Sequence, residues 1–266
     1  MNINNYSFKP EAHFFTFNNY SNRSNEAKYF GLEVETEYNG NEEEKIEAIE
    51  NINSKEYREQ IYLKQDGSLN NGIEIITHPF TYEFLKSNKF KLFEFINSNI
   101  IGNGFGSFKH NTTGTHIHLS KNHFNNKLHL LKFILFFKQN YWNIFNRISE
   151  RRSKHQVKYF CRNIKKTELR RATNGTLCNR TRYTMLNITS NTIECRIFQA
   201  NLRSDRILKN IEFLKCLIEF TELEKINKNF TSWSKFKVFV NNSSYENLKQ
   251  FLTIKKRKVT KWKKIH

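Results

Sequence analysis

The feature that most constrains this fold is a strict alternation of acidic and apolar residues near the N-terminus. In the segment YFGLEVETEY, which spans residues 29–38, the acids Glu33, Glu35 and Glu37 occupy alternate positions. Successive side chains of a β-strand point to opposite faces, so this period of two predicts a strand with one acidic and one apolar face.

Five other short segments have strand patterns, and longer segments between them have the apolar spacing of helices. The strands are predicted at residues 60–64, 72–77, 115–119, 183–188 and 192–198. The helices are predicted at residues 42–60, 80–97, 122–149, 203–226 and 245–254, while 150–180 is basic and irregular. This order predicts an α+β fold, in which a mainly antiparallel sheet carries helices on one side.

The composition is that of a folded protein, but it does not decide whether the protein binds nucleic acid. The 266 residues include 25 phenylalanines, whose rings can supply much of the burial in a core. The net charge of +19 would suit a nucleic-acid partner, yet most of the basic residues are spread along the chain. Only the basic C-terminal tail, residues 253–266, concentrates the charge, and nucleic acid could bind there.

Neither a zinc motif nor a membrane-spanning segment is expected. The four cysteines lack zinc spacing, and the N-terminus has no apolar stretch of the kind found in secretory signals. The most apolar run, 128–137, has about half the length that a membrane helix needs. We therefore expect a cytoplasmic protein without membrane contact, in which a lead-in at 1–28 precedes a catalytic domain at 29–252.

Four acids on or beside the predicted strands are candidate metal ligands. Glu33 and Glu35 share a strand face about 6.6–6.8 Å apart, so that they could hold two hard cations or share one Mg²⁺. Asp66 lies in a turn, and Glu74 lies on the next strand between isoleucines. For an isolated pair such as Glu33 and Glu35, an exposed acidic stripe is the commoner explanation.

Two further pairs have the same spacing of two. One imidazole of His116 and His118 could bind metal while the other meets a phosphate. Glu194 and Arg196 offer a carboxylate for metal and a guanidinium for phosphate, although a cross-strand salt bridge explains them equally well. The whole set describes a nucleotide–metal site better than a serine or cysteine hydrolase, because no nucleophile has an evident partner base.

The order of these motifs resembles the amidoligase family of phages and bacteria, a branch of the carboxylate–amine ligases that include glutamine synthetase and γ-glutamylcysteine synthetase. The matching segments are YSFKP at 6–10, FGLEVE at 30–35, KQDGSL at 64–69, GIEIITHP at 72–79, GTHIHLS at 114–120 and RYTMLNI with NTIECRIFQANL within 182–202. Two departures are Thr113-Gly114, where the family often has Cys-Gly, and residues 199–202, which replace an Arg-Gly-Thr-Leu-like ending.

The resemblance implies a glutamine-synthetase-like active-site sheet, ATP and two or more Mg²⁺ or Mn²⁺ ions as cofactors, and a set of residue roles. The implied metal ligands are Glu33, Glu35, Glu74, His116 and Glu194. The implied catalytic residues are Arg196, Glu35, Asp66 and His118. The implied contacts to ATP or phosphate are Arg196, His118, Arg182 and Lys64.

The resemblance also implies an ATP-dependent ligase that joins a carboxylate substrate to an amine substrate, either of which could belong to a macromolecule. An acyl phosphate would form first, and the amine would then displace phosphate. Glu37 or Asp66 is a candidate, from position alone, for the base that deprotonates the ammonium. Two alternatives remain: an inactive ligase fold that binds nucleic acid through its basic surface, and a metal-dependent hydrolase or nuclease.

Overall fold

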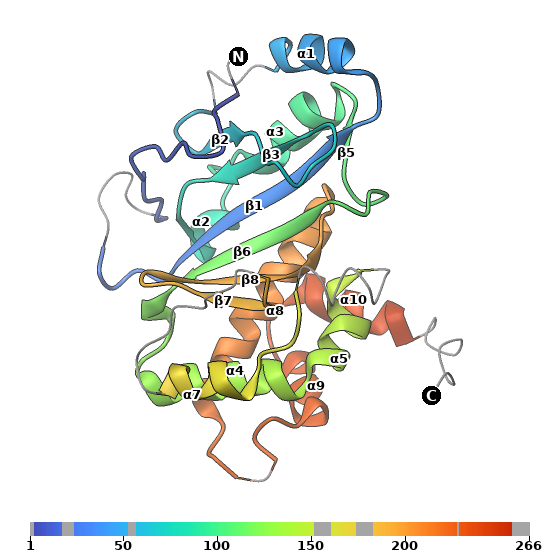
Figure 1. The fold of residues 1–266 in the computed structure, drawn as a ribbon. Helices are drawn as coiled ribbons and strands as arrows, with labels where there is room; N and C mark the ends of the chain where they lie inside the picture. Colours follow the sequence, from blue (N-terminus) through green and yellow to red (C-terminus); the bar gives the residue numbers. More distant parts are fainter. Residues whose placement is uncertain are drawn as a thin grey trace.

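An antiparallel β-sheet forms the centre of the structure (Figure 1). The computed structural model describes residues 3–17, 24–52, 57–151, 161–173, 183–227 and 229–256. Its strands are β1 (Tyr29–Tyr38), β2 (Ile61–Lys64), β3 (Gly72–Thr77), β4 (Phe80–Thr81), β5 (Phe105–Gly106), β6 (Gly114–Ser120), β7 (Leu186–Ile188) and β8 (Thr192–Gln199). The sheet order is β2-β3-β1-β6-β8-β7, and β4 and β5 also pair with β1.

Strand β1 lies between β3 and β6, and its apolar and acidic side chains point to opposite faces of the sheet, as the alternation predicts. Leu32 and Val34 are fully buried, and they lie opposite Ile117 of β6 and Ile75 of β3, which are also buried. These residues share one face because directly opposed side chains of antiparallel strands lie on the same side. The acids of β1 consequently point to the other face.

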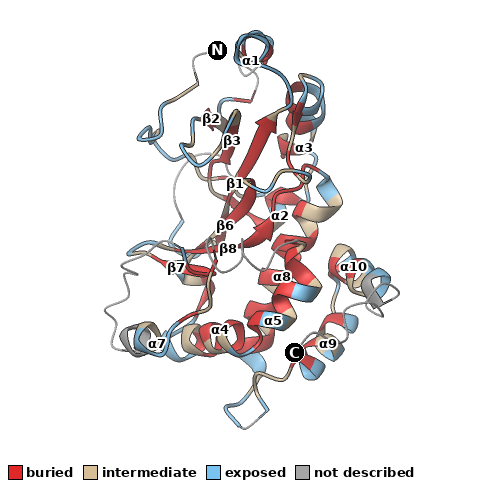
Figure 2. Ribbon diagram, turned by 45° about the vertical axis from the view of Figure 1, so that its right-hand side comes forward, coloured by how far each residue is buried: buried red, intermediate tan, exposed pale blue. Residues whose placement is uncertain are grey.

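Helices cover the apolar face of the sheet (Figure 2). The helices and helical turns are α1 (Glu42–Glu50), α2 (Tyr82–Leu85), α3 (Leu92–Phe95), η1 (Ile96–Ile101), η2 (Lys121–His123), α4 (Lys127–Gln139), α5 (Tyr141–Ile144), η3 (Phe145–Ser149), α7 (Lys166–Thr173), α8 (Ser204–Leu223), α9 (Trp233–Asn241) and α10 (Glu246–Lys256). The α+β prediction, with an antiparallel sheet and packed helices, is therefore confirmed. In the described part of the chain, no helix is both long and apolar enough to cross a membrane.

The other five predicted strands are all present, whereas two predicted helices are shorter than expected. The helix predicted at 42–60 ends at Glu50, where the last turn has no basic residue to favour the helix C-terminus. The segment 80–97 contains β4, α2 and α3. Between its two helices, the Ser87 hydroxyl donates to the carbonyl of Phe84 at 2.7 Å, a local bond that competes with continuation of the helix.

The helix predicted at 122–149 is also divided, and two helices were not predicted. Asn140 separates α4 from α5, and its amide group donates to the carbonyl of Thr231 at 2.7 Å. Helix α9 was missed because only three of its nine residues are buried, which leaves a weak apolar pattern. Helix α7 lies within the segment 150–180 that was predicted to be irregular.

The N-terminal segment, residues 3–17, runs along the sheet instead of away from it. Asn4 pairs with Lys64 of β2, and Phe15 pairs with Phe80 of β4, both in parallel. Phe15 is buried in the core. The segment is thereby held beside β2, at the edge of the sheet, and beside β4.

Candidate functional site

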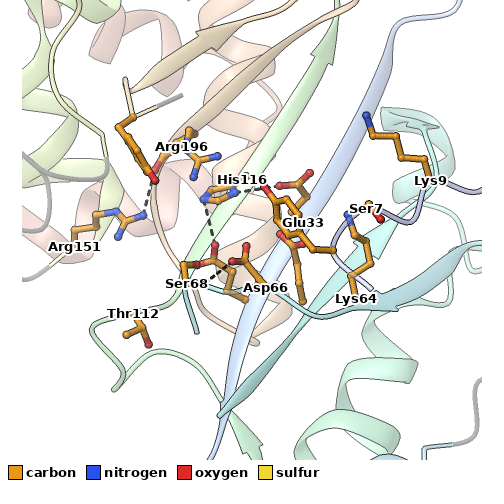
Figure 3. Close-up of a pocket in the computed structure, with 14 residues that line it drawn as sticks. Ser7, Lys9, Glu33, Lys64, Asp66, Ser68, Thr112, His116, Arg151 and Arg196 are labelled. Atoms are coloured by element: carbon orange, nitrogen blue, oxygen red, sulfur yellow. Dashed lines mark hydrogen bonds and ion pairs between the residues drawn. The ribbon is translucent and has the colours of Figure 1, made fainter. Parts of the chain in front are cut away.

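A cavity of about 530 Å³ lies over the acidic face of the sheet. Figure 3 shows acidic side chains and His116 in its middle, with Arg151 and Arg196 on one side and Lys9 and Lys64 on the other. Strands β1, β2, β3, β6 and β8 and the N-terminal segment all contribute to its lining. The cavity therefore combines a negative centre with positive flanks.

The register of the strands alone brings the acidic and imidazole groups together. Glu33 of β1 lies directly opposite His116 of β6, and His118 of β6 lies opposite Glu194 of β8. On the other side of β1, Glu35 lies opposite Glu74 of β3. Opposed residues on one face have Cβ atoms about 4.5–5.5 Å apart, so each pair is within ligand-sharing distance.

Glu33 is at the centre of an ion-pair network with two imidazoles. Its carboxylate lies 3.1 Å from Nδ1 of His116 and 2.9 Å from Nε2 of His118. Burial alone would raise the pKa of Glu33, but the two histidines hold it well below its usual value. Burial would likewise lower the pKa of His118, but Glu33 outweighs this and raises it to about 9.

In a second group of acids, the pKa values are raised instead of lowered. Glu74 is 4% exposed, and burial, followed by repulsion from Glu33, Glu35 and Asp66, raises its pKa to about 10. Burial also raises the pKa of Glu35, although His116 and Arg151 oppose the shift. This part of the site therefore has more carboxylates than its own cations can neutralise.

Three overlapping groups of donors could each hold a metal ion. They are Glu33 with His118 and Glu194, Glu33 with Glu74 and His116, and Glu35 with Asp66 and Glu74. Within each group the ligand atoms lie within 4.8 Å of one another. Glu33 and Glu74 each belong to two groups, so the three groups form one continuous row across the strands.

A β-bulge and neighbouring side chains position the Glu194–Arg196 pair. The pairing of β6 with β8 shifts between Thr115 and Ile117, as expected where an extra residue bends a strand beside a site. Glu194 accepts a 2.8 Å hydrogen bond from Asn187 of β7 and is paired with Arg196. Burial would raise the pKa of Glu194, but His118, His116 and Arg196 lower it.

The structure brings together all the described residues that the resemblance implied as metal ligands, catalytic residues or phosphate contacts. The predicted residues at or next to the cavity are Glu33, Glu35, Lys64, Asp66, Glu74, His116, His118, Glu194 and Arg196. Arg182 lies outside the described residues, as do residues 257–266 of the basic tail. The individual roles implied by the resemblance stay predictions.

Glu37 does not belong to the cavity, although it shares a strand face with Glu33. Its carboxylate accepts hydrogen bonds from the backbone amides of Asn70 and Asn71 at 3.0 and 2.8 Å and from the Thr112 hydroxyl at 2.5 Å. The side chain thus fastens the β2–β3 turn and a neighbouring loop. This placement gives no support to Glu37 as the base, so Asp66 is the candidate that lines the cavity.

Several cavity residues were not found by reasoning from the sequence. Arg151 follows η3 in a segment without periodicity, so no pattern singled it out. Tyr6, Ser7 and Lys9 belong to the N-terminal segment YSFKP, which was noted only as part of the resemblance. That segment is therefore the signal through which these three residues could have been found.

Comparison with known proteins gives no identification. No family model matches the sequence, and no curated protein matches it. The resemblance to amidoligases accordingly stays a prediction that rests on the order of the motifs and on the site that they form.

Proposed function

We propose that this protein is an ATP- and Mg²⁺-dependent carboxylate–amine ligase with a glutamine-synthetase-like active-site sheet. The observation that most supports the proposal is the continuous row of three donor groups on one sheet face. Cationic side chains flank this row on both sides within one cavity. An anionic substrate that binds through metal ions and cations together would find both kinds of partner here.

The chemistry of the donors fits hard divalent cations. Five of the seven residues in the three groups are carboxylates, and Mg²⁺ and Mn²⁺ prefer oxygen ligands. In the proposal, Glu33 and Glu194 hold one ion with an imidazole, while Glu35, Asp66 and Glu74 hold another. Such ions would supply neutralisation of polyphosphate charge. The raised pKa of Glu74 supports this assignment, because a cation would relieve the repulsion that raises it.

The proposed reaction overcomes the poor leaving group of a carboxylate. The carboxylate takes the γ-phosphoryl group of ATP, which gives an acyl phosphate and ADP. The amine then attacks the acyl carbon and releases phosphate, so that one amide, one ADP and one phosphate form. Within the chain, Arg196 and Lys64 would bind the phosphoryl oxygens. Asp66, at the wall of the cavity, would take the proton of the incoming ammonium.

Thermal unfolding tests the nucleotide–metal site without knowledge of the substrate. ATP–Mg²⁺ at about 100 times its dissociation constant should stabilise the protein by about 2.7 kcal/mol. Glu33→Gln and Glu194→Gln should lose this stabilisation, and Glu59→Gln, at an exposed position, should keep it. An absence of any shift for the wild type at millimolar ATP–Mg²⁺ would refute the proposal.

Product analysis separates the proposal from a hydrolase. Incubation with mixed acids and amines should release phosphate and ADP only when both substrates are present. Formation of AMP and pyrophosphate would contradict the acyl-phosphate route. Cleavage of nucleic acid or esters in the absence of ATP would instead support a metal-dependent hydrolase.

A further inference from the structure

Arg151 is a buried cation near the carboxylate of Glu35, and its guanidinium has an unused hydrogen-bond donor. It is 7% exposed, and its Nη2 donates to the backbone carbonyl of Arg196 at 3.2 Å. Its Nε has no hydrogen-bond partner, and no ion pair joins it to a carboxylate among the described residues.

Burying a guanidinium lowers the stability of the folded state unless a negative group lies beside it. A guanidinium stays charged at every pH that the protein meets, so it cannot escape burial by losing a proton. An uncompensated buried charge destabilises the folded state, and buried charges in proteins are normally paired. Glu35 offsets part of this charge, and because Arg151 lines the cavity, an anionic ligand can reach the donor that stays unused.

The backbone before Arg151 is held in a strained conformation that directs this side chain into the cavity. Glu150 has φ 61°, and it is the one residue other than glycine with a positive φ in the described chain. Such a conformation costs about 1–3 kcal/mol and persists where the surroundings enforce it. Here the Glu150 carboxylate lies 3.2 Å from the ammonium of the buried Lys209, whereas the next residue, Arg151, lines the cavity.

Strand β6 leaves room for the Arg151 guanidinium. A Cβ atom at Gly114 would lie 2.7 Å from Nη2 of Arg151 and 3.2 Å from Nε2 of His116. Both contacts are too close for a side chain to be tolerated without movement of one of these groups. The absence of a side chain at this position therefore allows the guanidinium to lie beside the metal-ligand row.

Arg196 supplies a second guanidinium on the same side of the cavity as Arg151. Its Nε, like that of Arg151, has no hydrogen-bond partner. Glu194 offsets part of the Arg196 charge, as Glu35 does for Arg151. We propose that Arg151 and Arg196 together form an oxyanion-binding site for a reacting substrate group. The nature of that group rests on the proposed function: it is either the transferred phosphoryl group or the substrate carboxylate.

Thermal unfolding in chloride buffer with inorganic phosphate as the probe tests the site. Wild type should gain stability as phosphate is added, and Arg151→Met should show at least about tenfold weaker apparent affinity. Arg203→Met is the matched control, since Arg203 is exposed and paired with Asp205, and it should respond to phosphate as wild type does.

Two results would overturn the inference: no stabilisation of wild type by phosphate, or an unchanged phosphate response in Arg151→Met. Should Arg151→Met not fold, Arg151→Lys keeps the charge without the planar fork. Its phosphate affinity should fall severalfold, and an unchanged affinity would refute the inference.

Nucleotide binding separates this site from the proposed function and identifies the anion. A non-hydrolysable ATP analogue and ADP, each with Mg²⁺, are titrated into wild type and Arg151→Met. Weaker binding of the triphosphate alone assigns the site to the transferred phosphoryl group. Unchanged binding of both nucleotides, with a lost phosphate response, assigns it to the substrate carboxylate. Phosphate binding through Arg151 without nucleotide binding would uphold the anion site and refute the ligase.

Discussion

Replacing Glu74 by glutamine should remove a pH dependence of stability from the metal-free protein. In the folded state, burial and three neighbouring acids raise the pKa of Glu74 from 4.5 to about 10. The folded protein therefore keeps a proton that the unfolded chain releases above pH 4.5. Rising pH favours the state that has fewer protons bound, so this group lowers the free energy of unfolding as pH rises from 4.5 towards 10.

The size of the effect follows from the same linkage. For each pH unit above 4.5, the free energy of unfolding falls by up to about 1.4 kcal/mol. Between pH 4.5 and about 7.5, Glu74 therefore lowers it by up to about 4 kcal/mol. Glutamine resembles the protonated carboxyl group in shape and has no proton to release. The Glu74→Gln variant should therefore be the more stable protein at neutral pH, with its advantage growing as pH rises.

Urea unfolding in EDTA at several pH values between 5 and 8 measures this difference. Comparing the two proteins at each pH cancels the contributions of other titrating groups, and Glu59→Gln controls for the loss of an exposed acid. Added Mg²⁺ should make the wild type the more stable of the two proteins, because its Glu74 carboxylate can bind the ion and the variant lacks that carboxylate. Parallel stability curves for wild type and Glu74→Gln would refute the electrostatic reasoning for this group.

Three further predictions address the flanks of the site and the core. Gly114→Ala should keep the fold but lose most of the phosphate stabilisation in thermal unfolding, because its Cβ would displace Arg151. Glu37→Gln should lower the free energy of unfolding by about 1–3 kcal/mol through weakened loop hydrogen bonds, yet leave the ATP–Mg²⁺ shift intact; loss of the shift would contradict its structural role. Burial lowers the pKa of His123 to about 3, so its contribution to stability is complete above pH 6.5 and falls by up to about 1.4 kcal/mol per pH unit below it. Urea unfolding of wild type and His123→Gln between pH 4 and 7 should show that dependence only in the wild type.

Sequence reasoning succeeded where a short period coincided with burial. The alternation of β1 predicted both its boundaries and its two faces, because each residue has only two possible directions in a strand. The pairs Glu33–Glu35 and His116–His118 were predicted to share faces for the same reason. Only the strand register shows that Glu33 meets His116 and that Glu35 meets Glu74. Register depends on contacts between distant segments, which no local pattern encodes.

Sequence reasoning failed where a single side chain decided the local structure. Asn140 divides a long apolar segment into α4 and α5 because its amide group binds the carbonyl of Thr231, 91 residues further along the chain. Arg151 was missed for a related reason, since its direction depends on the strained backbone of Glu150 and on the buried Lys209. Such long-range contacts override local propensity, and the residues that depend on them carry no period of their own.

The cavity is lined by strand residues and by residues of flanking segments, and we expect the flanking residues to determine which substrate binds. The metal-ligand row comes almost entirely from strand faces, so its geometry is set by the sheet and tolerates little variation. Lys9 comes from the N-terminal segment, and Arg151 comes from the second residue after η3; the conformation of each depends on a few contacts. In the proposed ligase, a change in these flanking segments can alter the groups around the carboxylate or amine substrate without disturbing the candidate metal ligands. Substrate identity should therefore respond to replacement of residues 6–9, while ATP–Mg²⁺ binding follows the strand residues.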